Sequence, residues 1–153
     1  MPDVTLRDIR PSDLEALYEL DQLCFEPGIA YSRGELKKIL GSSAGFGVLA
    51  EVESAIGGFA AGCLSGGKVG HVMTLDVAPG RRRLGIGKCL FTELMRRFAE
   101  ASVREVRLEV DPDNAAAVTF YESFGFHRTR IHPHYYGRGR AAWVMKKKLR
   151  IEN

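Results

Sequence analysis

A run of arginines and glycines, Arg82-Arg83-Leu84-Gly85-Ile86-Gly87, has the chemistry of an anion-binding turn. It follows a strand-like stretch that ends at Val77 and opens an amphipathic, helix-like stretch. Free N–H groups at a helix start lie at the positive end of the helix dipole, glycines let a phosphate approach the backbone, and arginines add positive charge. A dinucleotide-binding turn requires Gly-x-Gly-x-x-Gly and a nucleotide P-loop requires Gly-Lys-Ser/Thr, and the run contains neither. The run therefore predicts a phosphate-binding turn of another kind.

Two further side chains have types suited to proton transfer. Glu109 lies on the polar side of a predicted strand whose other side is apolar, and this position suits a solvated glutamate and a functional carboxylate equally well. Tyr121 follows Asn114 by seven residues, which is roughly 10 Å along a helix and almost the same face. Spacing alone favours a core aromatic at Tyr121, because it lies close to two phenylalanines.

The elements that must position these residues alternate along the chain. Capping boxes at Ser12 to Glu15 and at Ser32 to Glu35 predict two helix starts, and further helices are predicted from near Ile86 and from Asn114. Strands are predicted near residues 4–9, 46–52, 56–64, 69–77, 106–110, 126–131 and 141–149. The order β-α-α-β-β-β-α-β-α-β-β predicts an α+β fold, with a mixed, largely antiparallel sheet of six to seven strands and about four helices.

Composition limits the class of protein. With 153 residues, 45% of them apolar and 27% charged, the chain is predicted to form a single globular domain over residues 1–153. No apolar run approaches the roughly 20 residues of a membrane helix, and Met1-Pro2-Asp3 does not resemble a signal peptide, so we expect a cytoplasmic protein. The net charge of +3 is modest, and no direct nucleic-acid role is expected. His132-Pro133-His134 lacks further ligands nearby, so no metal is expected.

At this point the sequence resembles a known family. The motif Val77-x-Pro79-x-x-Arg82-Arg83-x-Gly85-Ile86-Gly87 resembles the acetyl-CoA motif of the GNAT N-acetyltransferases, and the order of elements matches that fold over nearly the whole chain. Downstream, Leu108-Glu109-Val110-x-x-x-Asn114-x-x-Ala117-x-x-x-Tyr121-x-x-x-Gly125-Phe126, followed by Tyr135-Tyr136, is similar to the RimI-like subgroup. That subgroup acetylates protein N-termini, including a ribosomal-protein alanine. The resemblance implies transfer of an acetyl group from acetyl-CoA to a primary amine.

The resemblance also implies roles for individual residues. The carboxylate of Glu109 would be the general base, Tyr121 would protonate the departing thiolate, and Asn114 would bond the pantetheine arm. Tyr135 and Tyr136 would hold the substrate. The remaining cofactor-binding residues would be the main chain of Leu75, Asp76 and Val77 along the arm, and Arg82, Arg83, Leu84, Gly85, Ile86, Gly87 and Lys88 around the pyrophosphate. Backbone N–H groups near Leu75 would stabilise the oxyanion.

The acceptor amine is less closely specified. A protein N-terminus, such as that of a ribosomal protein, suits a modest base, because its pKa is near 7.7–8.0 against about 10.4 for lysine. The chain departs from the subgroup at Ala141-Ala142, where Asp-Ala is usual, and at His132, where arginine is common. A GNAT that acetylates a small-molecule amine or a lysine side chain is the alternative. A binding module for nucleic acid or an acyl-CoA signal is a third interpretation, which Glu109, Asn114 and Tyr121 disfavour. We expect a monomer or a homodimer.

Overall fold

In the computed structural model, the described residues are 3–43, 46–82 and 84–149. The strands are β1 (Val4–Asp8), β2 (Gly47–Val52), β3 (Ala55–Leu64), β4 (Val69–Val77), β5 (Glu105–Val110), β6 (His127–His132) and β7 (Ala142–Lys148). The helices are α1 (Leu14–Cys24), α2 (Arg33–Ser42), α3 (Ile86–Glu100) and α4 (Ala115–Ser123), with short 3-10 turns η1 (Pro11–Asp13) and η2 (Pro79–Arg81). Their order confirms the predicted α+β arrangement.

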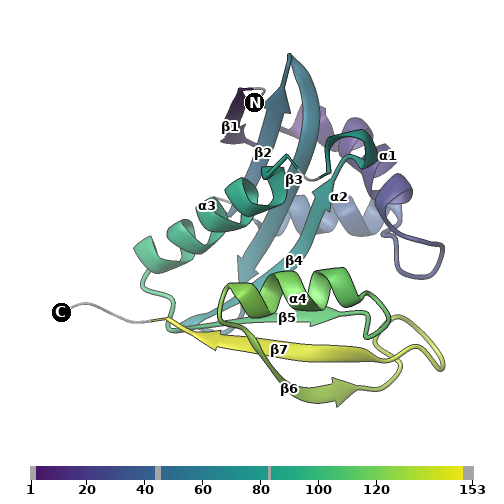
Figure 1. Cartoon of the computed structure of the whole chain (residues 1–153), viewed down its shortest axis with the longest axis vertical. Coiled ribbons are helices and arrows are strands. Elements are labelled where there is room, and N and C mark those ends of the chain that lie inside the picture. Colours follow the sequence, from purple (N-terminus) through teal and green to yellow (C-terminus); the bar gives the residue numbers. More distant parts are fainter. Residues whose placement is uncertain (1–2, 44–45, 83, 150–153) are drawn as a thin grey trace.

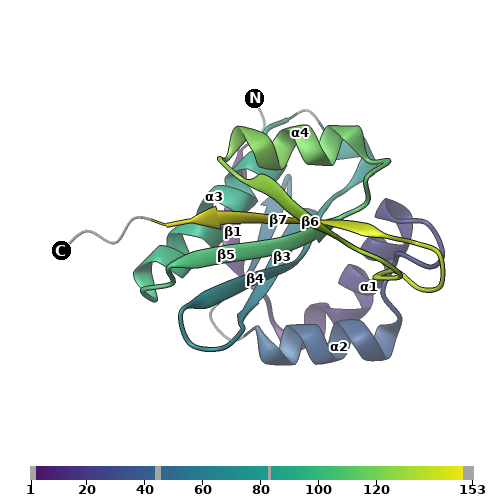
Figure 2. The same cartoon turned by 90° about the horizontal axis from the view of Figure 1, so that it is seen from below.

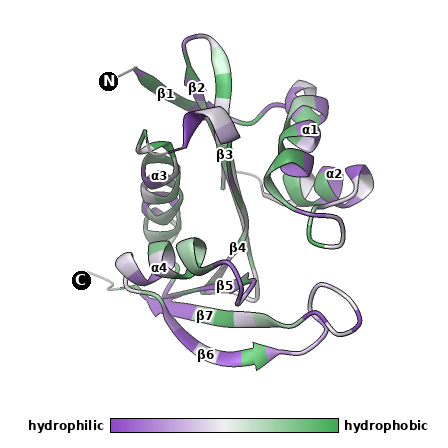
Figure 3. Cartoon of the chain, turned by 45° about the vertical axis from the view of Figure 1, so that its right-hand side comes forward, coloured by the Kyte–Doolittle hydropathy of each residue, from purple (hydrophilic) through white to green (hydrophobic). Residues whose placement is uncertain are grey.

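The strands form one seven-stranded sheet in the order β1-β2-β3-β4-β5-β7-β6. All neighbouring pairs are antiparallel except β4 and β5, which run parallel. Helices α3 and α4 cover one face of the sheet, and α1 and α2 cover the other (Figures 2 and 3). The result is a three-layer arrangement in which the central strands are buried on both faces.

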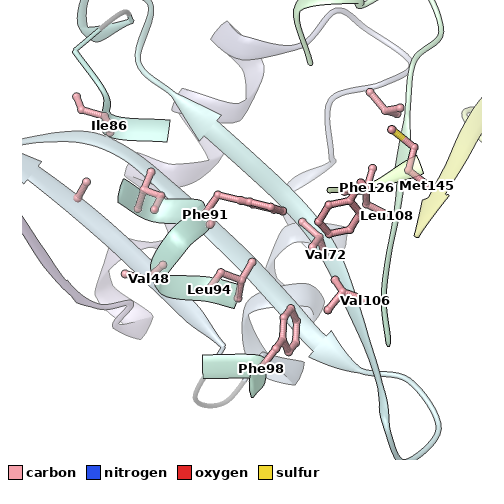
Figure 4. Packing of buried hydrophobic residues seen from close by; sticks show 14 of the residues in the cluster. Val48, Val72, Ile86, Phe91, Leu94, Phe98, Val106, Leu108, Phe126 and Met145 are labelled. Carbon is pink, nitrogen blue, oxygen red and sulfur yellow. The ribbon is translucent and has the colours of Figure 1, made fainter. Parts of the chain in front are cut away.

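Each face of the sheet has its own hydrophobic core. Val48 and Ala50 of β2 point toward α3, into a cluster that contains Phe91 and Phe98 (Figure 4). Leu49, which lies between them in sequence, points the other way, into a cluster with residues of α1 and α2. Because successive side chains of a strand point to opposite faces, one apolar strand supplies both cores.

Local sequence signals explain one of the first two helix starts but not the other. Ser32 and Glu35 form the predicted capping box, with Ser32 N–H donating to Glu35 Oε1 at 2.9 Å and Glu35 N–H donating to Ser32 Oγ at 3.1 Å. The box predicted at Ser12 is wrong. Asp13 is instead bound by the guanidinium of Arg7, at 2.9 Å for both N–O pairs, and α1 begins only at Leu14, after the turn η1.

A β-bulge at Met73 changes the faces of β4. Val72 and Thr74 pair with consecutive residues of β3, so Met73 is an extra residue in the ladder. Upstream, Val72 packs into the core beneath α3, and downstream Leu75 takes that side while Thr74 is buried on the opposite one. A bulge bends a strand and re-aims the side chains that follow it.

Strands β4 and β5 separate beyond this bulge. They pair only where Val69–His71 meets Glu105–Arg107, whereas β5 pairs with β7 along its whole length. Figure 1 shows β4 running away from β5, while β5 stays with β7 and β6. The separation leaves one edge of the second half of β4 without a neighbouring strand.

Candidate active site

A cleft of about 740 Å³ occupies the space between the separated strands. One end is formed by the start of α3, with Arg82, Gly85 and Lys88, and we call it the helix end. The other end is formed by Tyr31, Tyr135, Tyr136 and Glu109, and we call it the tyrosine end. The middle is lined by β4, β5 and α4.

The helix end has the features of an anion site. Gly85 precedes α3 with a φ of 79°, in the left-handed region that glycine enters without steric cost. The first intrahelical bond, from Cys89 N–H to Gly85 O, is 3.0 Å, so the preceding N–H groups of the helix have no intrahelical partner. No side chain of the described residues caps this end, and a Cβ placed on Gly85 would meet nothing within 4 Å. The predicted phosphate-binding turn therefore presents free donors to open space.

The edge of β4 that faces the cleft is partly used by other groups. The Met73 carbonyl accepts from the Tyr31 hydroxyl at 2.8 Å, and the Val77 carbonyl accepts from Cys24 Sγ and Arg82 Nε, both at 3.3 Å. Alternate residues of an antiparallel strand direct their main-chain groups to the same side. Leu75, midway between Met73 and Val77, is therefore placed with its main-chain groups toward the gap left by β5.

Glu109 is held by a residue that the sequence did not indicate. His71 Nε2 lies 2.8 Å and 2.7 Å from the two carboxylate oxygens of Glu109, and the side chains are 13% and 7% exposed respectively. Because a carboxylate only accepts hydrogen bonds, Nε2 of His71 must carry the proton and donate. Glu109 does lie on the polar side of β5 as predicted, but it is nearly buried and fixed in position.

The neighbourhood of Tyr121 combines packing with access to the cleft. Its ring packs against Phe91 and Phe126, with centroids 5.3 Å and 6.2 Å away, so it is part of the aromatic core as spacing suggested. It also lines the cleft, and burial raises the pKa of its hydroxyl, which is neutral at physiological pH. Asn114 is the N-cap of α4, accepting from Ala117 N–H at 3.1 Å, which leaves its amide N–H groups to donate elsewhere.

The tyrosine end is enclosed by two loops far apart in sequence. Burial, together with the nearby Glu109 carboxylate, raises the pKa of Tyr135 to about 12, so its hydroxyl remains a neutral donor. Arg140, beyond Tyr136 in the loop between β6 and β7, forms an ion pair with Glu26 and donates to the Pro27 carbonyl at 3.3 Å. The loop between β6 and β7 is thereby joined to the loop between α1 and α2.

Most of the predicted site residues meet in this cleft. Its lining includes Leu75, Val77, Arg82, Gly85, Ile86, Gly87, Lys88, Glu109, Asn114, Tyr121, Tyr135 and Tyr136. Leu84 does not line it, and the side chain of Asp76 is buried on the face toward α1, so only its main chain could serve a ligand in the cleft. Arg83 lies outside the described residues. The sequence did not indicate Tyr31 or His71, because the contacts of each depend on pairing with distant segments.

Two absences among the described residues concern other classes of site. No three of their His, Cys, Asp or Glu side chains are grouped as metal ligands would be. Among the helices described, none combines the length and the apolar character that a membrane crossing requires.

With the fold and the cleft established, comparison with known proteins identifies the class. The model of the acetyltransferase (GNAT) family matches residues 14–126, which is most of the chain. The protein belongs to the GNAT family of acetyltransferases. This agrees with the resemblance found in the motif from Val77 to Gly87.

Three relatives show which members of the family are similar. An N-alpha-acetyltransferase of Sulfurisphaera tokodaii is 37% identical over 83 residues, covering 54% of this chain and 50% of that protein. The [ribosomal protein bS18]-alanine N-acetyltransferase of Escherichia coli is 35% identical over 65 residues, covering 42% and 44%. This chain therefore matches about half the length of these curated relatives. The structure of Arabidopsis thaliana Naa50 in complex with the bisubstrate analogue CoA-Ac-MVNAL has a TM-score of 0.83 at 26% identity, covering 95% and 99% of the two chains.

Proposed function

We propose that this protein transfers an acetyl group from acetyl-CoA to the N-terminal α-amine of a protein or peptide. The observation that carries the proposal is a single cleft with donors for phosphate at its helix end and a buried, oriented carboxylate, Glu109, at its tyrosine end. Support from outside the chain comes from the S. tokodaii and E. coli relatives, which are named for N-alpha- and alanine N-acetylation, and from the bisubstrate analogue bound to Naa50.

The described residues at the helix end fit acetyl-CoA. The start of α3 offers uncapped N–H groups beside the open space at Gly85, and Arg82 and Lys88 line the same end. Such a helix start stabilises pyrophosphate through directed donors and the helix dipole. The free edge of β4 at Leu75 would pair with the pantetheine arm, as Asn114 would from the start of α4. Acetyl-CoA supplies the activated acyl group, and the chain supplies position and proton transfer.

We assign the two proton transfers to Glu109, at the tyrosine end, and to Tyr121 of α4, in the middle of the cleft. Glu109, oriented by His71, accepts a proton from the incoming ammonium, directly or through water, so that the neutral nitrogen attacks the carbonyl carbon. Main-chain N–H at Leu75 stabilises the negative charge on the carbonyl oxygen. As the bond from carbon to sulfur breaks, Tyr121 gives its proton to the thiolate, which is possible because its raised pKa keeps the phenol protonated. The nitrogen, which became positively charged in the attack, releases its second proton through water to the Tyr121 phenolate, so that the amide is neutral and the phenol is restored.

The tyrosine end favours a chain terminus over a bulky amine. The loops joined by Glu26 and Arg140 lie at this end of the cleft, where the hydroxyls of Tyr135 and Tyr136 can donate to a peptide carbonyl. An α-amine also has a lower pKa than a lysine side chain, so it needs less help from Glu109.

The test compares three acceptors with acetyl-CoA: a peptide with a free α-amine, its N-blocked copy with an internal lysine, and a polyamine. We expect the free peptide to react far faster than the other two. Glu109→Gln should slow it most at low pH, where less amine is neutral, whereas the matched control Glu105→Gln, on the same side of β5 but outside the cleft, should not. Equal rates on the free and blocked peptides, or reaction with the polyamine alone, would establish the lysine or small-molecule alternative instead.

A further inference from the structure

Two aspartates lie buried side by side beneath the cleft, on the face of the sheet that α1 covers. Asp21 belongs to the last turns of α1 and Asp76 to β4, and their exposed fractions are 0% and 1%. Two ionised carboxylates in contact and out of water would repel strongly, and within the described residues neither has a basic side chain bonded to it. Their arrangement therefore needs an explanation.

Hydrogen bonds around the pair leave one oxygen of each carboxyl group unused. Asp21 Oδ2 accepts from Tyr31 N–H at 2.7 Å, and Asp76 Oδ1 accepts from the Thr74 hydroxyl. Asp21 Oδ1 and Asp76 Oδ2 are buried and receive no donor from the described residues, and the two carboxyl groups are hydrogen-bonding neighbours. One proton on Asp76 Oδ2, donated to Asp21 Oδ1, would satisfy both of these oxygens.

The same pair is connected to the cleft through Tyr31. The main-chain N–H of Tyr31 donates to Asp21, and the hydroxyl of Tyr31 donates to the Met73 carbonyl at the bulge of β4. The loop between α1 and α2, which supplies Phe25 and Ile29 to the cleft, is thus fastened at Tyr31 to both α1 and β4. Asp76, three residues beyond the bulge, provides a second connection between β4 and the end of α1 through its contact with Asp21.

We propose that Asp21 and Asp76 share one proton, and that this carboxylic acid and carboxylate pair positions Tyr31 and its loop for the acceptor amine. A proton on either of the two facing oxygens leaves the Thr74 hydroxyl and the Tyr31 N–H their acceptors and leaves no oxygen without a partner. We assign it to Asp76, the carboxyl group whose electrostatic surroundings disfavour the ionised form, and take Asp21 as the carboxylate. Both are positioning residues and neither touches the reacting atoms. Their effect on the amine rests on the proposed function.

The electrostatic surroundings agree with this assignment. Burial, together with the Asp21 carboxylate, holds the pKa of Asp76 well above its usual value. The other titratable groups around the pair are Cys24 of α1, Tyr31, Arg82 after β4 and Tyr121 of α4. Burial raises the pKa of Cys24 to about 11 and raises that of Tyr31, so both are neutral. Arg82 is a positive charge that acts on Asp76, and it opposes the effect of burial.

The shared proton is tested by the pH dependence of Tm, which does not depend on the acceptor. Since folding raises the pKa of Asp76, the stability of the wild type falls as pH rises from the ordinary aspartate pKa through the raised one. Asp76→Asn keeps a donor toward Asp21 and does not titrate. The difference in Tm between this variant and the wild type should therefore shift in favour of the variant as pH rises. Asp13→Asn is the matched control, because Arg7 lowers the pKa of Asp13. As pH rises through the acid range, the Tm of this variant should therefore fall relative to that of the wild type. An Asp76→Asn curve parallel to the wild type overturns the shared proton.

Positioning is tested by comparing the two substrates. Asp21→Ala removes the acceptor for Tyr31 N–H, and we expect the KM for the free peptide to rise about tenfold while acetyl-CoA affinity changes less than twofold. Asp21→Asn keeps that acceptor and should restore most of the KM even where the alanine variant folds poorly. An unchanged peptide KM in Asp21→Ala, or an equal loss for both substrates, overturns the positioning role. Failure to acetylate any peptide contradicts the proposed function instead, and the Tm curves then decide the pair.

Discussion

Replacing Gly85 by alanine separates the cost of a strained backbone from the cost to a ligand. The φ of 79° lies in the left-handed region, where a Cβ costs about 1–2 kcal/mol. For a domain of this size each kcal/mol lowers Tm by about 2–4 °C, so the ligand-free variant should melt about 2–8 °C lower. No further clash with the described residues is expected without ligand, because the new Cβ would meet none of their atoms within 4 Å.

Gly85→Ala should reduce the stabilisation by acetyl-CoA more than it reduces the stability of the ligand-free protein. Acetyl-CoA at one hundred times its Kd stabilises the wild type by about 2.7 kcal/mol, which corresponds to a shift of about 5–11 °C. If the Cβ of Gly85→Ala occupies the space that the pyrophosphate needs and weakens binding a hundredfold, the same concentration gives about 0.4 kcal/mol and a shift of about 1–2 °C. Gly87 is a second site for the same test, since a Cβ there would already meet Val77 at 3.4 Å.

Thermal unfolding with and without acetyl-CoA measures both effects at once. Gly80→Ala is the matched control, because Gly80 lies in the same loop, has open space around it, and does not have a positive φ. It should lose neither Tm nor the ligand-induced shift. A Gly85→Ala variant that melts lower but keeps the full shift would show that the phosphates bind elsewhere, and the anion-site reasoning would be refuted.

Three further outcomes are expected. Tyr121→Phe should lower kcat more than acetyl-CoA affinity, measured by steady-state kinetics and ligand titration, and full turnover would restrict this tyrosine to core packing. Ser32→Ala should cost about 1 kcal/mol through the lost capping box, lowering Tm by about 2–4 °C with an unchanged acetyl-CoA shift. The guanidinium groups of Arg96 and Arg97 lower the pKa of Glu93 to about 2, so its contribution is present above the ordinary glutamate pKa and is lost as pH falls. The Tm deficit of Glu93→Gln at neutral pH should therefore shrink on acidification, and a deficit independent of pH would contradict this.

The sequence predicted correctly those elements of the fold whose bounds are set by residues close together in the chain. The strand Val69–Val77 was predicted with its observed bounds, because the turn at Gly66 and Gly67 and the loop after Val77 interrupt the apolar pattern on each side. The start of α3 near Ile86 and the N-cap at Asn114 were also correct, since both depend on a few neighbouring residues. These are the signals that place most of the cofactor-binding residues.

The features that the sequence did not reveal depend on contacts outside the pattern of a single element. The capping box predicted at Ser12 is replaced by Asp13, whose carboxylate accepts from Arg10 N–H at 2.7 Å and from the guanidinium of Arg7 on β1. The bulge at Met73 is invisible in the alternation of β4, because it appears only when that strand is paired with β3. The contact of His71 with Glu109 joins residues 38 positions apart, and no spacing rule within either strand predicts it.

The parallel pairing of β4 and β5 explains why the chemistry lies at this point of the sheet. Two parallel strands end at the same edge, and here each is followed by a loop and then by a helix start, at Ile86 after β4 and at Ala115 after β5. Separation of the strands beyond His71 opens a gap between them, and both helix starts line that gap. Ligands of sheets with parallel strands commonly bind in such a crevice at the carboxyl ends. An antiparallel neighbour in place of β5 would have paired with the free edge of β4 and brought only one helix start to it, leaving no place for an extended arm between a phosphate site and Glu109.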